Sequence, residues 1–314
     1  MSKKLTVASL FSGAGGMDIG FSNAGFEVVW ATDFDKDACE TYHRWSGLKP
    51  VCADISELDI STIPDIDVIV GGFPCQGFSM AGNRNVDDSR NLLYKNFVEC
   101  VSKKKPLAFV AENVSGLLTI GGSNEIAKRI MAAFSREGYS VNWVVLKASR
   151  MGVPQDRKRL IIVGIRSDVD VFPTLPVHDD VITTMRMVLW GLDKPEHDDI
   201  FWGSFSSQFM SRNRVRGWDE PSFTVIATSC QTPLHPSSPP MVRIGKEKWE
   251  FGEGETRRMS WREAALIQTF PASLEFSGNI SSKHRQIGNA VPCKLAERVA
   301  RCLLSDLSGH GEIR

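Results

Sequence analysis

One stretch predicts how the chain is organised: Asp67-Val68-Ile69-Val70-Gly71-Gly72-Phe73-Pro74-Cys75-Gln76-Gly77-Phe78-Ser79. The apolar, β-branched run from Val68 to Val70 is typical of a buried parallel strand. The two glycines end this strand, and Pro74 stiffens the chain that follows. Cys75 is therefore expected in a rigid loop at the carboxyl end of a strand, where open α/β sheets bind their ligands. The simpler alternative is a buried structural cysteine, since free cysteine is among the most buried residue types.

Length and composition narrow the class of protein. The 314 residues are enough for two domains, and the 37 basic and 37 acidic residues argue against a histone-like polyanion binder. No apolar run approaches the ~20 residues of a membrane span. The seven cysteines are scattered singly, and no CxxC or HExxH pattern is present. Met1 to Lys4 lead into a strand without a signal-peptide pattern. We therefore expect a cytoplasmic protein without a metal site.

The amino-terminal segment has the strand–turn–helix–strand pattern of a nucleotide-binding α/β unit. A strand over Leu5 to Leu10 leads into the turn Phe11-Ser12-Gly13-Ala14-Gly15-Gly16-Met17-Asp18, and the helix that follows ends at Gly25. A second strand over Glu27 to Ala31 is followed by Asp33, which stands 20 positions after the first glycine of the turn. That distance is usual for a carboxylate that binds ribose hydroxyls.

Asp18 stands where a dinucleotide-binding GxGxxG motif has its third glycine. A carboxylate there fits poorly beside a pyrophosphate and better beside an ammonium group, such as that of S-adenosylmethionine. A glycine-rich turn without a ligand is the alternative. Asp54 and Ile55 follow a short strand around Val51, at a position to meet an adenine ring, and we expect them and Phe34 to contact the cofactor.

Two further polar groups adjoin predicted strands. Glu112 and Asn113 close the apolar strand Leu107 to Ala111, and a solvated strand-end carboxylate is the alternative to a reactive one. The spacing Gln155-x-Arg157-x-Arg159 precedes another apolar strand and puts the three side chains on one face of an extended segment. Such a face is either solvated or serves a phosphate or an acidic partner. Between these features, the polar stretch Gln76 to Leu93 is long enough to predict a functional loop, often a lid.

Six motifs, in order, resemble those of the DNA (cytosine-5) methyltransferase family, and the resemblance spans nearly the whole chain. It implies a Rossmann-like α/β sheet that binds S-adenosyl-L-methionine, with a smaller, mostly β or irregular target-recognition domain. The motifs are Phe11-Ser12-Gly13-Ala14-Gly15-Gly16 for the cofactor, Gly72-Phe73-Pro74-Cys75-Gln76 for the nucleophile, Glu112-Asn113-Val114 for cytosine, Gln155-x-Arg157-x-Arg159, Arg258 to Pro271, and Gln286-Ile287-Gly288-Asn289-Ala290-Val291-Pro292.

The chemistry implied by this resemblance explains the residue types. C5 of cytosine becomes nucleophilic only when a thiolate, here Cys75, adds to C6. The charge on the ring must be relieved at N3, and Glu112 fits as the acid that hydrogen-bonds there. Arg157 is expected to hold the cytosine O2 and position the carboxylate, and Arg159 to support the loop. Asn113 is expected to bridge from Glu112 to the region of Pro74.

A base inside a duplex is out of reach of Cys75 and must be flipped out, which costs a few kcal/mol. We expect Gln76, Ser79 and their neighbours to contact the DNA and fill the vacated space. In the carboxy-terminal half, Arg212, Arg214 and Arg216 alternate, and in an extended segment they share one side. Such arginines suit guanine contacts in the major groove, with phosphate contact or plain solvation as the alternatives.

The expected domain boundaries follow from a change of pattern after Pro176, where regular alternation stops and prolines become frequent. We expect a catalytic domain over residues 1–176, a recognition domain over 177–281 and a return segment over 282–314. The segment Arg212 to Pro236 resembles the recognition region of GGCC-specific modification methylases, although Thr228-Ser229-Cys230-Gln231 stands where those enzymes tend to have a basic residue. A final helix from Asn289 to about Ser305 is expected beside the cofactor loop, with Asn289, Ala290 and Val291 at the methionine end of the cofactor.

These observations predict a monomeric methyltransferase that acts on double-stranded DNA, as the modification enzyme of a bacterial restriction system with a cognate restriction endonuclease. Three alternatives are weighed. A tRNA cytosine-5 methyltransferase has a similar architecture, but the arginine-rich segment argues against it. A DNA-binding relative without activity is disfavoured by the intact cysteine and glutamate motifs. An NAD-dependent oxidoreductase is disfavoured by Asp18.

Overall fold

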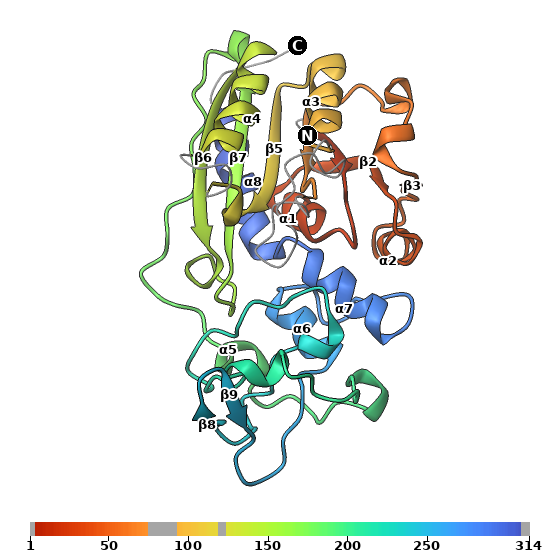
Figure 1. The fold of residues 1–314 in the computed structure, drawn as a ribbon. Helices are drawn as coiled ribbons and strands as arrows, with labels where there is room; N and C mark the ends of the chain where they lie inside the picture. The colour runs from red at the N-terminus through yellow and green to blue at the C-terminus, as the bar shows by residue number, and fades with distance from the viewer. Residues whose placement is uncertain (1–3, 75–92, 119–123, 309–314) are drawn as a thin grey trace.

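The computed structural model describes residues 4–74, 93–118 and 124–308, and the first half of the chain forms a seven-stranded sheet (Figure 1). The strand order is β3-β2-β1-β4-β5-β7-β6. Neighbouring strands are parallel from β3 to β5, whereas β7 is antiparallel to both of its neighbours. The predicted open α/β sheet is confirmed. Its strands are β1 (Thr6–Leu10), β2 (Glu27–Asp33), β3 (Val51–Cys52), β4 (Val68–Gly71), β5 (Ala108–Val114), β6 (Tyr139–Lys147) and β7 (Lys158–Arg166).

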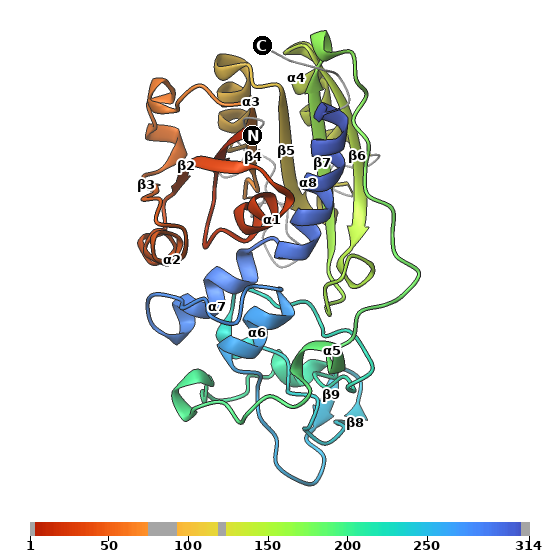
Figure 2. The same ribbon diagram turned by 180° about the vertical axis from the view of Figure 1, so that it is seen from behind.

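Alternate residues of the central strands face opposite sides of the sheet, as the two-residue period of a strand requires. Val68 and Val70 pack against α1 and α8, whereas Ile69 packs against α3 and α4. Figures 1 and 2 show these helix pairs on the two faces of the sheet. Because both faces are covered, the strand reads as a continuous apolar run in the sequence. The described helices that accompany the sheet are α1 (Gly16–Ala24), α2 (Lys36–Ser46), α3 (Leu93–Lys104), α4 (Glu125–Arg136) and, from the end of the chain, α8 (Cys293–Ser308).

The reversed direction of β7 determines what gathers at one edge of the sheet. Parallel strands β1, β2, β4 and β5 all end at that edge, and antiparallel β7 begins there. The segments predicted to carry the chemistry therefore meet at this edge. They are residues 11–16 after β1, Asp33 at the end of β2, residues 72–74 after β4, residues 112–113 of β5, and residues 157–159 at the start of β7.

Residues 177–281 contain little regular structure and lie below the sheet in Figure 1. Their longer elements are α5 (Arg186–Leu189), α6 (Trp261–Ile267) and the hairpin of β8 (Val242–Gly245) and β9 (Lys248–Glu250). The predicted irregular character is confirmed, while the regular β structure is limited to the hairpin. Among the described helices, none has the length and apolar character that crossing a membrane requires.

The return to the sheet departs from the sequence prediction in one respect. Asn289 is the last residue of α7 (Ile280–Asn289), and the final helix α8 begins at Cys293. Ala290 is extended, with ψ of 148°, and Pro292 has no backbone N–H to donate to a preceding turn. The prediction that one helix starts at Asn289 is therefore wrong, and residues 290–292 link the two helices beside the predicted cofactor loop.

Candidate active site

Glu112 is paired with Arg159 at the end of β5. The Nε atom of Arg159 lies 2.6 Å from Oε1 of Glu112, and the two side chains are only 13% and 11% exposed. Val114 is directly opposite Arg159 in the β5–β7 ladder, so Glu112 is the diagonal neighbour of Arg159 on the same face. Burial lowers the pKa of Arg159, and the charge of Glu112 opposes that effect. The pair thus presents a carboxylate and a guanidinium together at the sheet edge.

Arg157 has a different role from the one predicted. It is 1% exposed and donates hydrogen bonds to three backbone carbonyls: Val225 (2.9 Å), Gly288 (3.0 Å) and Ala290 (3.1 Å). Burial, reinforced by the neighbouring charge of Arg159, lowers its pKa well below the usual value. The expectation that Arg157 positions the carboxylate and Arg159 the loop is wrong, because Arg159 pairs with the carboxylate and Arg157 ties three segments together.

A buried glutamine pair reinforces this junction and was not singled out from the sequence. Gln155 donates through Nε2 to Oε1 of Gln268 (2.8 Å) and accepts from the N–H of Val225 (2.8 Å). Gln268 in turn donates to the carbonyls of Ile287 (2.6 Å) and Ala290. Both glutamine side chains are completely buried. The sequence places one glutamine in each of two motif segments, which was the available signal for this pair. It does not indicate that the two side chains meet across 113 positions.

The loop after β4 is held to the end of β5. Asn113 donates through Nδ2 to the carbonyl of Phe73 (3.0 Å), which is the bridge towards Pro74 that the sequence predicts. A Cβ added at Gly72 would lie 2.9 Å from Oε2 of Glu112, so this carboxylate packs directly over the glycine backbone. Cys75, Gln76 and Ser79, with the rest of the predicted lid up to residue 92, lie outside the described residues.

The predicted cofactor loop is fixed by the strand beside it. Ser12 donates from its N–H to the carbonyl of Thr32 (3.0 Å), and Gly13 donates from its N–H to Oδ2 of Asp33 (2.8 Å). Burial raises the pKa of Asp33, and its backbone hydrogen bonds oppose the rise. Phe11 and Gly13 both have left-handed backbones, with φ of 54° and 53°. A Cβ at Gly13 would meet no atom within 4 Å, so the loop is open on that side.

The second predicted cofactor segment packs against this loop. A Cβ at Gly16 would overlap the carbonyl oxygen of Val291 and lie 3.2 Å from Cβ of Ala290. Glycine is therefore required at position 16 by the close approach of the return segment. Asn289 is exposed at the end of α7, while Val291 is buried. Residues 11–16 and 289–291, which are far apart in the chain, are neighbours in the fold.

The three residues expected to contact the nucleoside part of the cofactor differ in how exposed their side chains are. Phe34 is 69% exposed, so its ring is open to a ligand. Asp54 caps a short helical turn, accepting from the N–H (2.8 Å) and hydroxyl (2.7 Å) of Ser56, and these bonds lower its pKa. The side chain of Ile55 is buried in the core. Phe34 and Asp54 thus have exposed side chains, whereas that of Ile55 is covered.

Asp18 does not face a ligand site. Its side chain is fully buried within α1 and accepts a hydrogen bond from the hydroxyl of Tyr42 (3.2 Å). Burial raises the pKa of Asp18 to about 6. The expectation that this carboxylate meets the ammonium group of a cofactor is corrected, because other parts of the protein cover it.

The three alternating arginines do not share an exposed face. Arg214 is 8% exposed and donates to the carbonyls of Gln208 and Phe209 and to the side chain of Gln231. Arg216 donates to the carbonyl of Pro221 (3.0 Å), pairs with Asp156 (3.3 Å) and stacks on Phe223. Only Arg212 is exposed. The prediction of a common DNA-facing side is therefore wrong for Arg214 and Arg216, whose guanidinium groups hold the local backbone.

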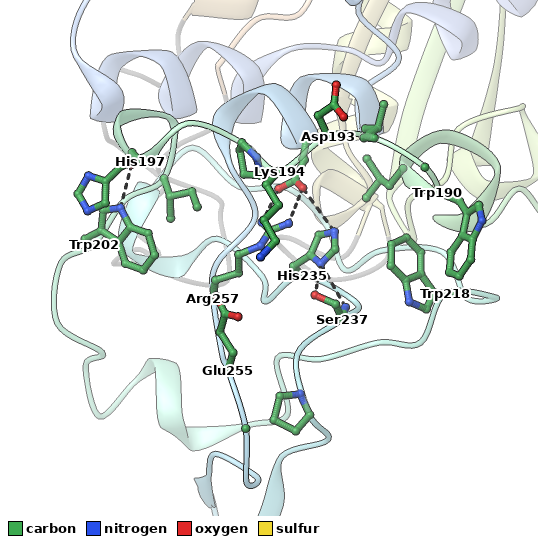
Figure 3. Close-up of a pocket in the computed structure, with 18 of the residues that line it drawn as sticks. Trp190, Asp193, Lys194, His197, Trp202, Trp218, His235, Ser237, Glu255 and Arg257 are labelled. Carbon is green, nitrogen blue, oxygen red and sulfur yellow. Dashed lines mark hydrogen bonds and ion pairs between the residues drawn. The ribbon is translucent and has the colours of Figure 1, made fainter.

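A cavity of about 880 Å³ lies in the irregular half of the protein (Figure 3). Trp190 and Trp218 pack edge to face on one side of it, and Trp202 stands on another. At its floor, Arg257 forms two hydrogen bonds of 2.8 Å to Glu263, beside His235, whose pKa burial lowers to about 4. Among the residues that the structure describes, none of the predicted catalytic or cofactor residues lines this cavity.

Comparison with known proteins identifies the family of the chain. A family model for C-5 cytosine-specific DNA methylases matches residues 5–198 and 192–305. The type II methyltransferase M.MthTI of Methanothermobacter thermautotrophicus is 39% identical over 97% of this chain and 98% of its own. M.FnuDI of Fusobacterium nucleatum is 37% identical over 99% of this chain and 97% of its own.

Solved structures share the fold. A prophage-encoded DNA modification methyltransferase of E. coli superposes with a TM-score of 0.74 at 25% identity, covering 97% of this chain and all of the other. DNMT2 of Spodoptera frugiperda superposes with a TM-score of 0.73 at 16% identity, over 96% of this chain and all of its own, and so shows the fold alone. The chain belongs to the C-5 cytosine-specific DNA methylase family and is a DNA (cytosine-5) methyltransferase.

Proposed function

We propose that this enzyme methylates C5 of a flipped-out cytosine in a short double-stranded DNA site, through a transient bond between Cys75 and C6. The observation that carries the proposal is the ion pair of Glu112 and Arg159 beside the backbone of Gly72. Cys75 follows Pro74 in the sequence, and the chain up to Phe73 is tied to the same strand end by Asn113. The acid and the guanidinium therefore lie at one edge of the sheet, and the segment that precedes the nucleophile in the sequence is tied to the same edge.

Each residue has one task in the proposed reaction. The thiolate of Cys75 bonds to C6 of the cytosine, and the electron pair of the C5–C6 double bond becomes available at C5. Glu112 is the acid that hydrogen-bonds to N3, and Arg159 donates to the adjacent O2 while keeping the carboxyl group in position. After methylation, a base removes the C5 proton and the bond to Cys75 breaks. Arg157 acts only by holding the surrounding backbone.

S-adenosylmethionine fits the residues of the cofactor edge. The side of Gly13 where a Cβ would stand is open, Asp33 lies beside it, and the ring of Phe34 is exposed. Asp33 would hold the ribose, Phe34 and the backbone at Asp54 and Ile55 the adenine, and residues 289–291 the methionine end. When bound, the cofactor supplies an electrophilic methyl group.

We further infer the organisation and biological setting. Residues 1–176 form the catalytic domain, 177–281 the recognition domain, and 282–314 the return segment. The resemblance of Arg212 to Pro236 to GGCC-specific enzymes supports a GGCC target, and exposed Arg212 is the candidate contact. The type II relatives support a role beside a cognate restriction endonuclease. The enzyme acts as a monomer, one strand at a time.

Bisulfite sequencing of DNA from cells that express the protein tests the activity and identifies the target together. We expect protected cytosines at one short motif, and none with Cys75→Ser. In parallel, transfer of a labelled methyl group to duplex DNA and to tRNA is compared with purified protein. Transfer to tRNA but not to DNA would replace this proposal with the RNA-modifying alternative, and a fully active Cys75→Ser would remove the covalent mechanism.

A further inference from the structure

Trp45 of α2 contacts the cofactor loop, although the proposed chemistry does not use it. Its indole Nε1 donates a hydrogen bond to the carbonyl of Ala14 (3.0 Å). A Cβ added to Gly15 would lie 2.5 Å from Cζ2 of the same ring. The indole therefore lies against the backbone of two consecutive residues in the loop.

Trp45 adds a hydrogen bond from outside the loop at a point where the backbone has an unusual conformation. Gly13 and Gly15, on either side of Ala14, both have positive φ, at +53° and +86°. Glycine occupies several regions of backbone space at similar cost, so these two residues do not by themselves select one orientation of the peptide planes. Asp33 holds the N–H of Gly13 from one side, and Trp45 holds the carbonyl of Ala14 from the other. The N–H of Gly15 belongs to the same planar peptide unit and donates to the carbonyl of Ser12 (2.9 Å), so Trp45 and Ser12 hold the two polar ends of one peptide.

Helix α2 is itself rigidly placed, so Trp45 can transmit that position to the loop. Asp35 caps the helix, accepting from two backbone N–H groups, and pairs with Arg285 of α7 (2.9 Å). The hydroxyl of Thr41, also in α2, donates to Oε1 of Gln286 in α7 (2.6 Å). The ring of Tyr42 lies 5.1 Å from that of Trp45 and braces it. The loop is thus positioned by an element that also contacts the return segment.

We propose that Trp45 is a positioning residue for the cofactor loop, and that its indole N–H sets the affinity of the enzyme for S-adenosylmethionine. The inference rests on the proposed function, since it takes this loop as the cofactor-binding loop. Trp45 is partly buried and holds the loop backbone, and we assign it no contact with the reacting atoms. Its removal should affect the binding of cofactor and leave the chemical step intact.

The test is Trp45→Phe, which keeps an aromatic ring and removes the N–H. Loss of one hydrogen bond of ordinary strength corresponds to a roughly tenfold effect on affinity. We expect Kd and KM for S-adenosylmethionine to rise about tenfold, while kcat at saturating cofactor and KM for DNA stay within about twofold. Trp143→Phe, at a half-exposed position on β6, is the matched control and should change none of these.

Calorimetric titration with S-adenosylmethionine and with S-adenosylhomocysteine separates the outcomes. Wild-type protein that binds neither would overturn the proposed function. Wild-type protein that binds both, together with unchanged affinity in Trp45→Phe, would overturn this inference alone. A parallel loss of kcat and of unfolding free energy, without a specific change in cofactor affinity, would also overturn it by reducing Trp45 to a structural residue.

Discussion

The sheet and the irregular half of this enzyme satisfy their backbone groups in different ways. In the sheet, strands pair with one another along β5, β7 and β6. In residues 177–281, where strand pairing is scarce, arginine side chains donate hydrogen bonds to the backbone carbonyls. Arg258 donates to the carbonyls of Phe201, Gly203, Ser204 and Cys230. A guanidinium has five donors in a rigid fork, which suits it to carbonyls that no strand can reach.

Aromatic rings complete this arrangement in the irregular half. The guanidinium of Arg258 lies 3.8 Å from the ring centre of Phe205, and that of Arg214 lies 4.7 Å from the ring centre of Phe209. Phe209 also belongs to the small hydrophobic core of this region. Arginines here are core components, and their number is a poor guide to how many contact DNA.

At the sheet edge, Arg159 pairs with a carboxylate, whereas Arg157 holds backbone carbonyls. The largest expected effect on turnover comes from replacing Arg159. Arg159→Gln removes the partner of Glu112 and, in the proposed reaction, the donor to O2 of the cytosine. We expect kcat to fall about 10²- to 10³-fold, as for loss of a positioned donor, with cofactor affinity unchanged. Arg166→Gln, at the far end of β7, is the control for substitution in the same strand. Near-normal turnover in Arg159→Gln, measured by labelled methyl transfer, would contradict the assignment.

The strongest expected effect on stability lies in the irregular half. Arg258→Leu leaves four carbonyls without their donor, in a position that is 2% exposed. We expect the free energy of unfolding in urea to fall by about 3 kcal/mol, given the cost of unsatisfied buried polar groups. The exposed Arg243→Ala, on the hairpin, should stay within about 0.5 kcal/mol of wild type. If both variants lose equally little, the guanidinium is not what holds this region together.

A buried charge in the sheet half predicts a pH effect of intermediate size. Burial raises the pKa of Asp18 to about 6 from 3.8, so its stabilising protonated form is lost as pH rises towards and through 6. Asp18→Asn does not titrate. Between pH 5 and pH 8, the stability of Asp18→Asn relative to wild type should rise by roughly 1 to 2 kcal/mol. An unchanged difference in urea unfolding at the two pH values would show that the carboxylate is not held as described.

The smallest expected effect concerns the exposed arginine of the irregular half. Arg212→Ala should weaken DNA binding by about 1 kcal/mol and lower the slope of log affinity against log salt by about one, if the contact is to a phosphate. If the contact is to a base, the loss should be confined to the cognate sequence. Fluorescence anisotropy with cognate and scrambled duplexes measures both. If Arg212→Ala binds each duplex with the same affinity as wild type, Arg212 does not contact the DNA.

The sequence predicts the sheet better than the pairing of side chains across it. The continuous apolar run and the two glycines that follow it were enough to place β4, since local patterns determine a buried strand. The pairing of Glu112 with Arg159 depends on β7 running antiparallel to β5, and strand direction comes from long-range contacts. The burial of Arg214 was also unreadable, because alternation places a side chain on a face without stating what covers that face.

The central claim is that the sulfur of Cys75 bonds to cytosine while Glu112 and Arg159 hold the base. Duplex DNA with 5-fluorocytosine at the target position blocks the final proton loss and should trap that bond. With S-adenosylmethionine present, we expect a denaturation-resistant complex of one chain and one duplex, whose peptide map places the DNA on Cys75. Absence of this complex, with a wild-type protein that methylates the normal duplex, would contradict the account.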